Sequence, residues 1–518
     1  MKRRTFLQTA AAASAVALLP GKKAYPRRKL LFPQESPEPA LQRLVDAAMD
    51  KGAEYADARF VRSQHQQIQA RKEAIYSIND RHSEGIALRV YKDGNWGMAA
   101  VRHGEEYDPR WKAEEACDAA HIAGSIQKLP FTNDGRLTGS KRTWHGQSKR
   151  NPFEVPLKDK TDFLLSLTRP PLEKQGIVYT VANLFFTRDE SVYVNSLGGS
   201  AEQSATITYP NYGITAYLQQ QGRIDSRNSD IEPVQAGFEA IEAYDFKDDV
   251  LISADEVLAK QAAGTIEDGK YEVLFTSTHL WKALYDVFFP HLDPYKLFGL
   301  DGENPQWRLF TPSDIGKRTI GSELFTVQYD NSMPFALGTH GWDAGGYPAQ
   351  KGTIIEGGQF LGLPGSDEFQ HLGRQWRGKS MGAASWQHQP QFAMPNLVVP
   401  HTEEGKSLQE MVQGIENGFL IAGRNQSIVA ADGKGYRSTG QLGWYIQNGE
   451  VKRMVRDFVY DARLEDFLAN IVELGGPQTV TVGGDLFPQN NNPGWSTPFS
   501  VSMPAVKIKD VPMYSSAK

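Results

Sequence analysis

Two long stretches of alternating polar and apolar residues decide what this chain can fold into. Apolar residues take every second position from Ala56 to Phe60 and again from Ile86 to Val90, and residues 178–222 have the same character. Asp93-Gly94, between two such runs, is a tight-turn signal. A period of two is typical of a strand with one buried face. We therefore expect meanders of long strands over residues 55–103 and 178–222.

Helical patterns lie between and beyond these strands. Apolar residues recur at helical spacing from Leu41 to Met49, where Gly52 stops the pattern, and residues 109–126 and 249–262 also predict helices. Ser407-Leu408-Gln409-Glu410 is a capping box, which predicts a helix ending at Gly418, and another helix is expected over 464–474. From Gly269 onward the chain is otherwise rich in Gly, Pro and short strands.

These patterns place the chain in the α+β class. We expect a mixed α/β N-terminal domain over residues 37–262, followed by a β-rich C-terminal domain over residues 263–518. Residues 25–36 (YPRRKLLFPQES) have the composition of a linker.

The first 24 residues have the character of an export address. They read MKRRTFLQTAAAASAVALLPGKKA, with a basic start and an apolar run too short for the roughly 18 residues of a membrane span. Arg3-Arg4-Thr5-Phe6-Leu7 resembles the twin-arginine export signal. We expect an exported, periplasmic or extracytoplasmic protein whose signal is either cleaved or kept as a tether. No later stretch is long and apolar enough to span a membrane.

Charge and cysteine content exclude several classes of function. The whole chain carries a net charge of −5, and the first 24 residues hold five positive charges and no acid, so the remainder carries −10. A body this acidic is a poor match for a phosphate backbone, which argues against nucleic-acid binding. The single cysteine, Cys117, excludes an internal disulfide, a zinc ribbon and an iron–sulfur cage. Its place on an alanine-rich helix predicts a small buried side chain.

Generic catalytic motifs are absent, but a series of short phrases resembles the TldD/PmbA family. Neither HExxH, a GxSxG elbow, a P-loop nor a GxGxxG sequence is present. The phrases occur in the family's order: Gly52–Arg59, Gly85–Val90, Asp93–Gly97, Gly341–Asp343, Tyr347–Lys351, Ile354–Gly358, Met394–Leu397, the Ser407 helix and Gly443–Glu450. The resemblance implies the fold of a family described as modulators of DNA gyrase and as zinc metallopeptidases with their partner subunits.

The segment that carries catalysis in this family differs here. Family peptidases place HExxxH on a helix, with a distant C-terminal cysteine as third zinc ligand and the Glu as general base. The matching helix begins at Ser277, and its Leu280-Trp281 pair sets the register. On that register the first histidine is replaced by Tyr285, the Glu by Asp286 and the second histidine by Pro290.

The third ligand is also missing, because residues 490–502 (NNNPGWSTPFSVS) contain no cysteine. Zinc is bound in proteins by Cys, His, Asp and Glu, so Tyr285 and Pro290 are unsuitable ligands. We therefore expect neither zinc nor another cofactor, and no peptidase activity from the chain alone; Asp286 keeps only a shortened general-base position. The alternative is a relocated metal site built from Asp286, His291 and Asp293.

Two loop features are weaker candidates for a binding role. Residues 386–390 (WQHQP) and His401 could contact a peptide, although structural roles are favoured. Asp343 matches only part of the family's acidic turn, because Ala344 and Gly345 stand where the family has two acidic residues.

The resemblance and the lost ligands together predict a pseudoenzyme of the PmbA (TldE) type. Such subunits lack the metal motif and pair with a TldD-type homologue to enclose a chamber that admits unfolded peptides. The alternatives are an active metallopeptidase with the relocated site, and a homodimeric, non-catalytic peptide-binding protein. Under each of these readings we expect no nucleic-acid partner.

Overall fold

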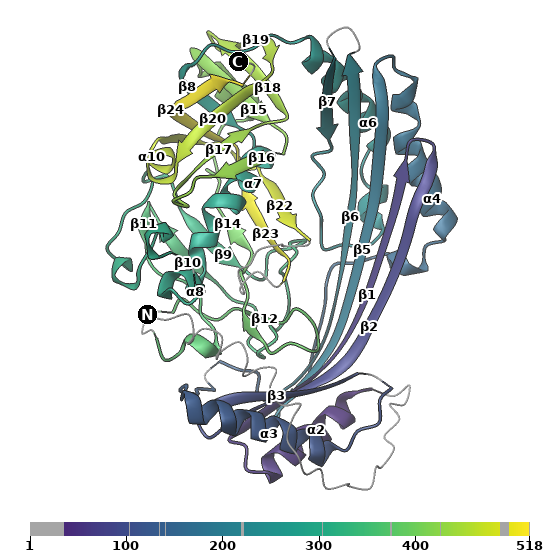
Figure 1. Ribbon diagram of the computed structural model, residues 1–518, viewed down its shortest axis with the longest axis vertical. Helices are drawn as coiled ribbons and strands as arrows, with labels where there is room; N and C mark the ends of the chain where they lie inside the picture. The colour runs from purple at the N-terminus through teal and green to yellow at the C-terminus, as the bar shows by residue number, and fades with distance from the viewer. Residues whose placement is uncertain are drawn as a thin grey trace.

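The computed structural model describes residues 36–102, 104–133, 135–139, 141–218, 222–302, 304–372, 376–424, 426–486 and 497–516. The expected export signal (residues 1–24) and all but the last residue of the expected linker (25–36) lie outside the described residues. The α+β class is confirmed: helices pack on one long sheet in the N-terminal half, and the C-terminal half is built mainly from strands (Figure 1).

A strongly elongated antiparallel sheet forms the N-terminal half. Its order is β3-β2-β1-β5-β6-β4, with β7 also paired to β6. Only β4 runs parallel to its neighbour. The strands are β1 (Tyr55–Arg71), β2 (Ala74–Lys92), β3 (Asn95–Arg102), β4 (Arg142–His145), β5 (Ile177–Asn195), β6 (Ser200–Leu218) and β7 (Arg223–Asn228). The two strand regions expected from alternation are therefore present, and Asp93 and Gly94 both have positive φ in the β2–β3 turn.

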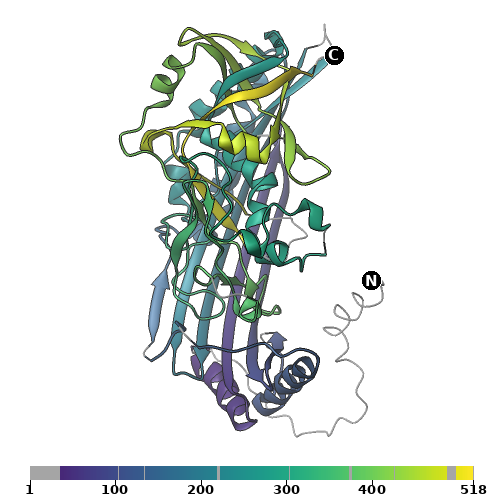
Figure 2. The same ribbon diagram turned by 90° about the vertical axis from the view of Figure 1, so that its left-hand side faces the viewer.

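Helices cover the outer face of this sheet at its two ends. At one end α2 (Glu38–Asp50) and α3 (Pro109–Ile126) pack on β1–β3, and Cys117 is buried there as expected. At the other end α4 (Leu157–Thr168) and α6 (Phe246–Ala262) pack on β5 and β6, beside the short α5 (Glu239–Glu242). Figures 1 and 2 show the two helical groups separated along the length of the sheet.

The C-terminal half contains three sheets around one large core. The largest has the order β16-β17-β20-β24-β8-β15-β18-β19, with β21 paired to β24. Its strands are β8 (Gly269–Phe275), β15 (Asn417–Ala422), β16 (Gln426–Val429), β17 (Gly435–Thr439), β18 (Leu442–Gln447), β19 (Glu450–Val455), β20 (Phe458–Arg463), β21 (Ile471–Leu474) and β24 (Val506–Ser515).

The other two sheets are smaller. One has the order β11-β10-β9-β14-β23-β22, and the other pairs β12 with β13. Their strands are β9 (Val327–Asp330), β10 (Lys351–Glu356), β11 (Gln359–Phe360), β12 (Met381–Gly382), β13 (Gln391–Phe392), β14 (Leu397–Val398), β22 (Thr481–Asp485) and β23 (Phe499–Met503). The helices of this half are α7 (Ser277–Val287), α8 (Pro294–Phe298), α9 (Leu408–Gln413) and α10 (Leu464–Ala469).

Two expected helix ends are corrected. The Ser407 capping box forms, because Ser407 and Glu410 bond each other's backbone N–H, but α9 ends at Gln413 and Gly418 belongs to β15. The helix expected over 464–474 ends at Ala469, and Ile471 starts β21. In both places pairing with a neighbouring strand prevails over helical periodicity. Among the described residues, no helix has both the length and the apolar character needed to cross a membrane.

Candidate functional site

The helix that matches the family's catalytic helix is α7. It follows β8 and packs between β22, β23 and the edge of the largest sheet, with Leu280, Trp281 and Leu284 almost completely buried. These residues form an apolar stripe at helical spacing, and this stripe packs the helix against its neighbours. The Trp281 indole donates a hydrogen bond to Glu232 at 3.0 Å, which ties α7 to the segment that leaves the N-terminal sheet.

Tyr285, which the resemblance aligns with the first zinc ligand of the family, is buried, with 3 % exposure. Its ring stacks on Phe499 at 5.5 Å between centroids and meets Trp281 edge-on. Phe499 lies in the stretch where the resemblance expects the cysteine ligand. The structure thus brings this stretch into contact with Tyr285 through two aromatic rings. Burial raises the pKa of the Tyr285 phenol above its usual range, so the phenol remains protonated at neutral pH.

Asp286, which the resemblance aligns with the family's general base, forms an ion pair with Lys282 one helical turn earlier. Burial raises the pKa of its carboxyl, and Lys282 opposes that shift. Pro290, at the second histidine position, lies in a short 3-10 turn beyond the end of α7 and has no side-chain donor atom. The Asp286 carboxylate is therefore paired with the Lys282 ammonium group.

The residues of the alternative site have separate partners. The His291 ring is bonded through Nε2 to the carbonyl oxygen of Gly433 at 2.9 Å, and burial lowers its pKa to about 3. Asp293 caps α8 by accepting a hydrogen bond from the Tyr295 N–H at 2.7 Å, and burial raises its pKa to about 7. Lys296 affects the pKa of both residues, but the other charged groups that affect the pKa of His291 are not those that affect the pKa of Asp293.

The donor set around α7 does not fit zinc. Tyr285 is a buried, protonated phenol, Pro290 offers no ligand atom, and Phe499 packs against the Tyr285 ring. In the described part of the chain, no three or more His, Cys, Asp or Glu side chains form a group that could hold a metal ion.

One face of the long sheet is turned toward the C-terminal half, and we call it the inner face (Figure 1). Tyr209 on this face lies beside Arg424, and Ile207 packs on Leu337 and Leu486. Because Leu486 follows Asp485, whose charge acts on Tyr285, the surroundings of Tyr285 lie close to the inner face.

The inner face is polar where the alternation leaves β1 and β5 unburied. A chain of hydrogen bonds crosses three strands from Arg71 to Gln69 (2.8 Å), from Gln69 to Asn183 (2.7 Å) and from Asn183 to Asn211 (2.9 Å). Asp189, further along β5, is exposed to solvent, yet the surrounding protein raises the pKa of its carboxyl.

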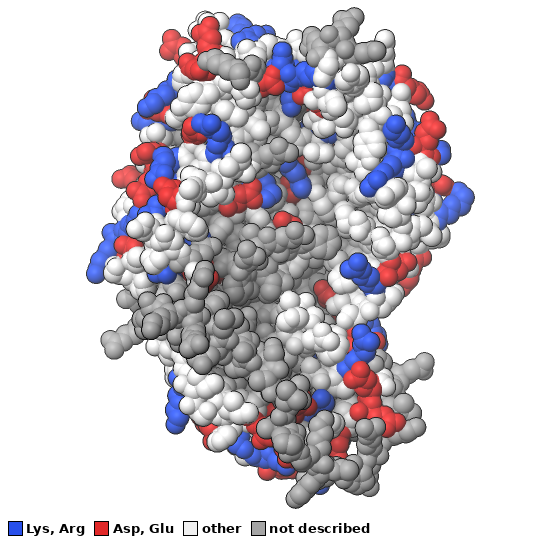
Figure 3. Space-filling model, in the orientation of Figure 1, with Lys and Arg blue, Asp and Glu red and all other residues white. Residues whose placement is uncertain are grey.

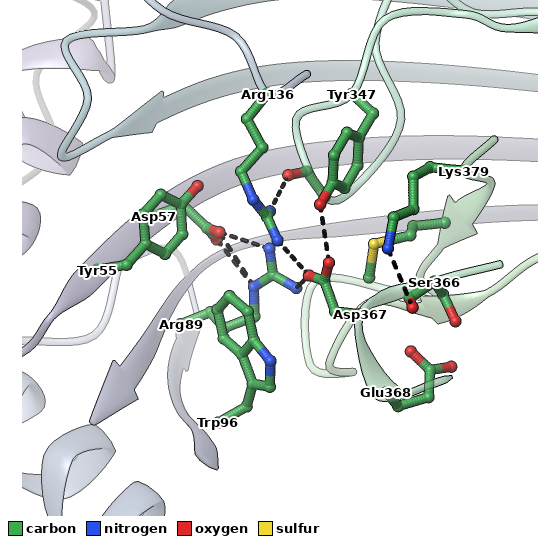
Figure 4. Close-up of polar contacts among 12 residues, drawn as sticks. Tyr55, Asp57, Arg89, Trp96, Arg136, Tyr347, Ser366, Asp367, Glu368 and Lys379 are labelled. Atoms are coloured by element: carbon green, nitrogen blue, oxygen red, sulfur yellow. Dashed lines mark hydrogen bonds and ion pairs between the residues drawn. The ribbon is translucent and has the colours of Figure 1, made fainter. Parts of the chain in front are cut away.

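A buried network of charges joins the base of the inner face to the C-terminal half (Figure 4). Arg89 donates to Asp57 at 2.6 Å and 3.0 Å and to Asp367 at 3.2 Å. Arg136 donates to the same Asp367 oxygen at 2.5 Å, and Tyr347 donates to the other oxygen at 2.9 Å. Charge-assisted bonds of this kind hold a geometry firmly when every member has partners. We call this set the joint network.

Aromatic rings surround the two arginines of the joint network. The Arg89 guanidinium lies 4.2 Å from the ring centre of Trp96, and that of Arg136 lies 4.6 Å from that of Tyr347. Weakly hydrated guanidinium groups are suited to such stacked, buried positions.

The loop candidates have structural contacts. Asp343 is buried and accepts hydrogen bonds from the backbone N–H groups of Gly345, Tyr347 and Met381, so it shapes its own turn. The Trp386 ring covers Gly85, where a Cβ would lie 2.3 Å from a ring atom, and its indole donates to Ser83 at 3.0 Å. Sequence reasoning missed Arg59, Glu232 and Asp367; the only available signal was the presence of charged residues in otherwise buried segments.

The charges on the visible surface are mixed. On the face shown in Figure 3, acidic and basic side chains are interspersed over both halves of the molecule.

Comparison with protein families matches two segments of the chain. Residues 269–514 match a model described as the PmbA/TldA metallopeptidase C-terminal domain, and residues 56–121 match one described as PmbA/TldA metallopeptidase domain 1.

Curated relatives match most of the chain. A metalloprotease of Methanothermobacter thermautotrophicus is 23 % identical over 465 residues, covering 88 % of this chain and 94 % of the relative. A metalloprotease of Synechocystis sp. is 22 % identical over 430 residues, covering 81 % and 86 %.

Solved structures share the fold. A putative modulator of DNA gyrase from Thermotoga maritima has a TM-score of 0.69 at 17 % identity, with 92 % of this chain and 100 % of that chain covered. TldE from Thermococcus kodakarensis has a TM-score of 0.64 at 16 % identity, with the same coverage of both chains.

Proposed function

This chain belongs to the PmbA/TldD family, and on that premise we propose that it is an exported, zinc-less subunit that shapes a peptide chamber together with a catalytic homologue. One observation carries the proposal: Tyr285 stands at the first ligand position, buried and stacked on Phe499. A well-packed helix without metal ligands is expected in a subunit that retains the family fold but has no catalytic metal site.

The inner face supports a role in holding an extended chain. Amide side chains on β1, β5 and β6 present both donors and acceptors, which match the backbone groups of a peptide without regard to its sequence. The exposed Asp189 carboxyl and the half-buried Ser63 and His65 beside it add polar contacts in the same region. Recognition through backbone hydrogen bonds suits unfolded segments, whose side chains vary.

A homologous partner follows from the family. The family resemblance implies that subunits lacking the metal motif pair with a TldD-type subunit, and the fold of this chain is shared with a protein named TldE. The partner supplies the zinc and the hydrolysis, and the present chain supplies walls and an interface. The twin-arginine-like start of the sequence supports a location of this assembly outside the cytoplasm.

The proposal is tested by isolating the protein from its native periplasm and identifying what is bound to it. We expect co-purification with a homologue that carries HExxxH, one zinc per pair, and peptidase activity that disappears when the partner's Glu is replaced by Gln. The matched control is the chain expressed alone, which should be inactive.

Two results would contradict the proposal in different ways. Stoichiometric metal in the isolated chain, lost on replacing Asp286 or His291, would favour the relocated site. If the chain formed a homodimer and did not bind a co-expressed zinc-bearing homologue, the result would favour the hypothesis of a non-catalytic peptide-binding protein.

A further inference from the structure

Arg59 is a buried cation with almost none of its hydrogen-bonding capacity used. It lies on the inner face of β1, two residues after Asp57, and is 6 % exposed. Its one hydrogen bond to a described residue runs from Nη2 to the carbonyl oxygen of His388 at 3.0 Å. No hydrogen bond joins its Nε or Nη1 atom to a described residue, and neither is among the fully buried atoms that lack a partner. The side chain is thus largely desolvated, and most of its N–H groups have no acceptor among the described residues.

The carboxylates nearest to Arg59 are occupied by other donors. Asp57 receives three contacts from Arg89, involving both of its oxygens. Asp343 is bonded by three backbone N–H groups. Neither makes an ion pair with Arg59 within the described ranges. The guanidinium therefore senses these charges only at a distance.

The pKa of Arg59 is shifted in the opposite direction to the pKa values of the neighbouring Arg89 and Arg136. Burial lowers the pKa of Arg59 to about 10, and the charge of Asp57 opposes that shift only in part. The carboxylates beside Arg89 and Arg136 raise the pKa of those two groups in spite of burial. A buried charge without a counter-ion is costly for a folded protein. Such a cost is common where a site is prepared for a ligand of opposite charge.

We propose that Arg59 is the receptor for a carboxylate group of a ligand that lies against the inner face. A guanidinium presents two parallel N–H groups that match the two oxygens of a carboxylate. In the chamber proposed above, the carboxylate belongs to a peptide, either at its C-terminus or on an acidic side chain; this last step alone rests on the proposed function.

The position of Arg59 fits a terminal anchor. It lies at the base of the inner face, beneath the loop that contains Trp386 and His388, while the amide side chains of Gln69 and Asn183 lie further along the same strands. A peptide that followed the strands would have its end held at Arg59 and its backbone contacted by the amides. Trp386 closes the neighbouring position over Gly85.

The test compares thermal unfolding of wild-type protein and variants in sodium acetate and sodium chloride of equal ionic strength. Acetate should raise the unfolding temperature of the wild type above its value in chloride, with saturation at increasing concentration. Arg59→Met should abolish the acetate response and should raise the unfolding temperature in chloride, because an unpaired buried charge has been removed. Arg62→Met, on the opposite face of the same strand, is the control and should keep the acetate response.

Arg59→Lys retains the charge without the paired N–H geometry and should weaken the acetate response at least severalfold. The proposal would be overturned if the acetate response persisted in Arg59→Met. It would also be overturned if Arg59→Met had a lower unfolding temperature in chloride than the wild type, because that result is expected if Arg59 only stabilises the loop through its bond to His388. Three tetra-alanine peptides distinguish a terminal carboxylate from a side-chain carboxylate. The first has a free C-terminus, the second has a C-terminal amide, and the third has a C-terminal amide and one internal Glu. These arms also separate this proposal from the proposed function, because acetate binding does not require a peptide or a partner.

Discussion

Replacing Asp367 by Asn is the sharpest test of the joint network. Asp367 is buried between two guanidinium groups, with contacts of 3.2 Å to Arg89 and 2.5 Å to Arg136. Asn has nearly the same shape but no charge, so both arginines stay buried with one counter-ion, Asp57, between them. Breaking a buried pair by removing one partner costs about 3–5 kcal/mol in the free energy of unfolding. Because two cations lose their shared partner, we expect a value toward the upper end of that range.

The pH dependence of the wild type should have the corresponding sign. Burial opposes ionisation of Asp367, but Arg136 and Arg89 hold the pKa of its carboxyl below its ordinary value of 3.8. A carboxyl whose pKa is depressed on folding contributes stability above its unfolded pKa and loses that contribution as the pH falls through the folded pKa. The stability difference between wild type and Asp367→Asn should therefore be constant near neutrality and should shrink below pH 3.8.

Urea unfolding followed by circular dichroism at neutral pH measures the effect, with limited proteolysis to show whether the two halves separate. Asp461→Asn, which removes one partner of an exposed pair with Arg437, is the matched control and should change little. A loss in Asp367→Asn no larger than in this control would refute the reasoning. Adding Arg136→Met to Asp367→Asn should recover part of the stability, because one unpaired charge is removed.

Three further predictions concern other parts of the structure. Tyr285→Phe should cost about 1 kcal/mol, whereas Tyr285→Ala should cost about 3–5 kcal/mol because it leaves a cavity beside Phe499, as urea unfolding would show. Burial lowers the pKa of His279 to about 4, so the neutral ring contributes stability that is present above pH 6.5 and lost toward pH 4. His279→Phe should therefore reduce the dependence of the free energy of unfolding on pH in this range by about 1.4 kcal/mol per pH unit, as measured by acid titration. Trp386→Ala should free the loop at residues 384–389 from Gly85 and Ser83, and an increased rate of limited proteolysis in this loop would show it.

The strands and most helices could be predicted because their signals are local. Alternation in β1 and β2, helical spacing in α2 and the Ser407 capping box all reflect side chains a few residues apart. The predicted ends at Gly418 and Leu474 were wrong because strand pairing with distant segments decides them. Local propensity carries no information about a partner strand far away in sequence.

The candidate site divides in the same way. The replacements at Tyr285, Asp286 and Pro290 could be recognised because the family motif is contiguous. The contact of Tyr285 with Phe499, far along the chain, needed the fold. Arg59 and Asp367 could not be found from the sequence, because the importance of a charged residue depends on which partners the fold brings within reach.

Metal analysis of the purified protein is the most direct test of the central claim, that the position of the family's zinc site is filled by a packed, protonated phenol. The chain should be isolated without chelators, equilibrated with excess zinc and dialysed before elemental analysis, with a zinc-bearing family member treated in parallel. The account predicts no stoichiometric zinc in this chain and one zinc per chain in the parallel sample. One equivalent of zinc retained by this chain, and lost on substitution of Asp286 or His291, would contradict it.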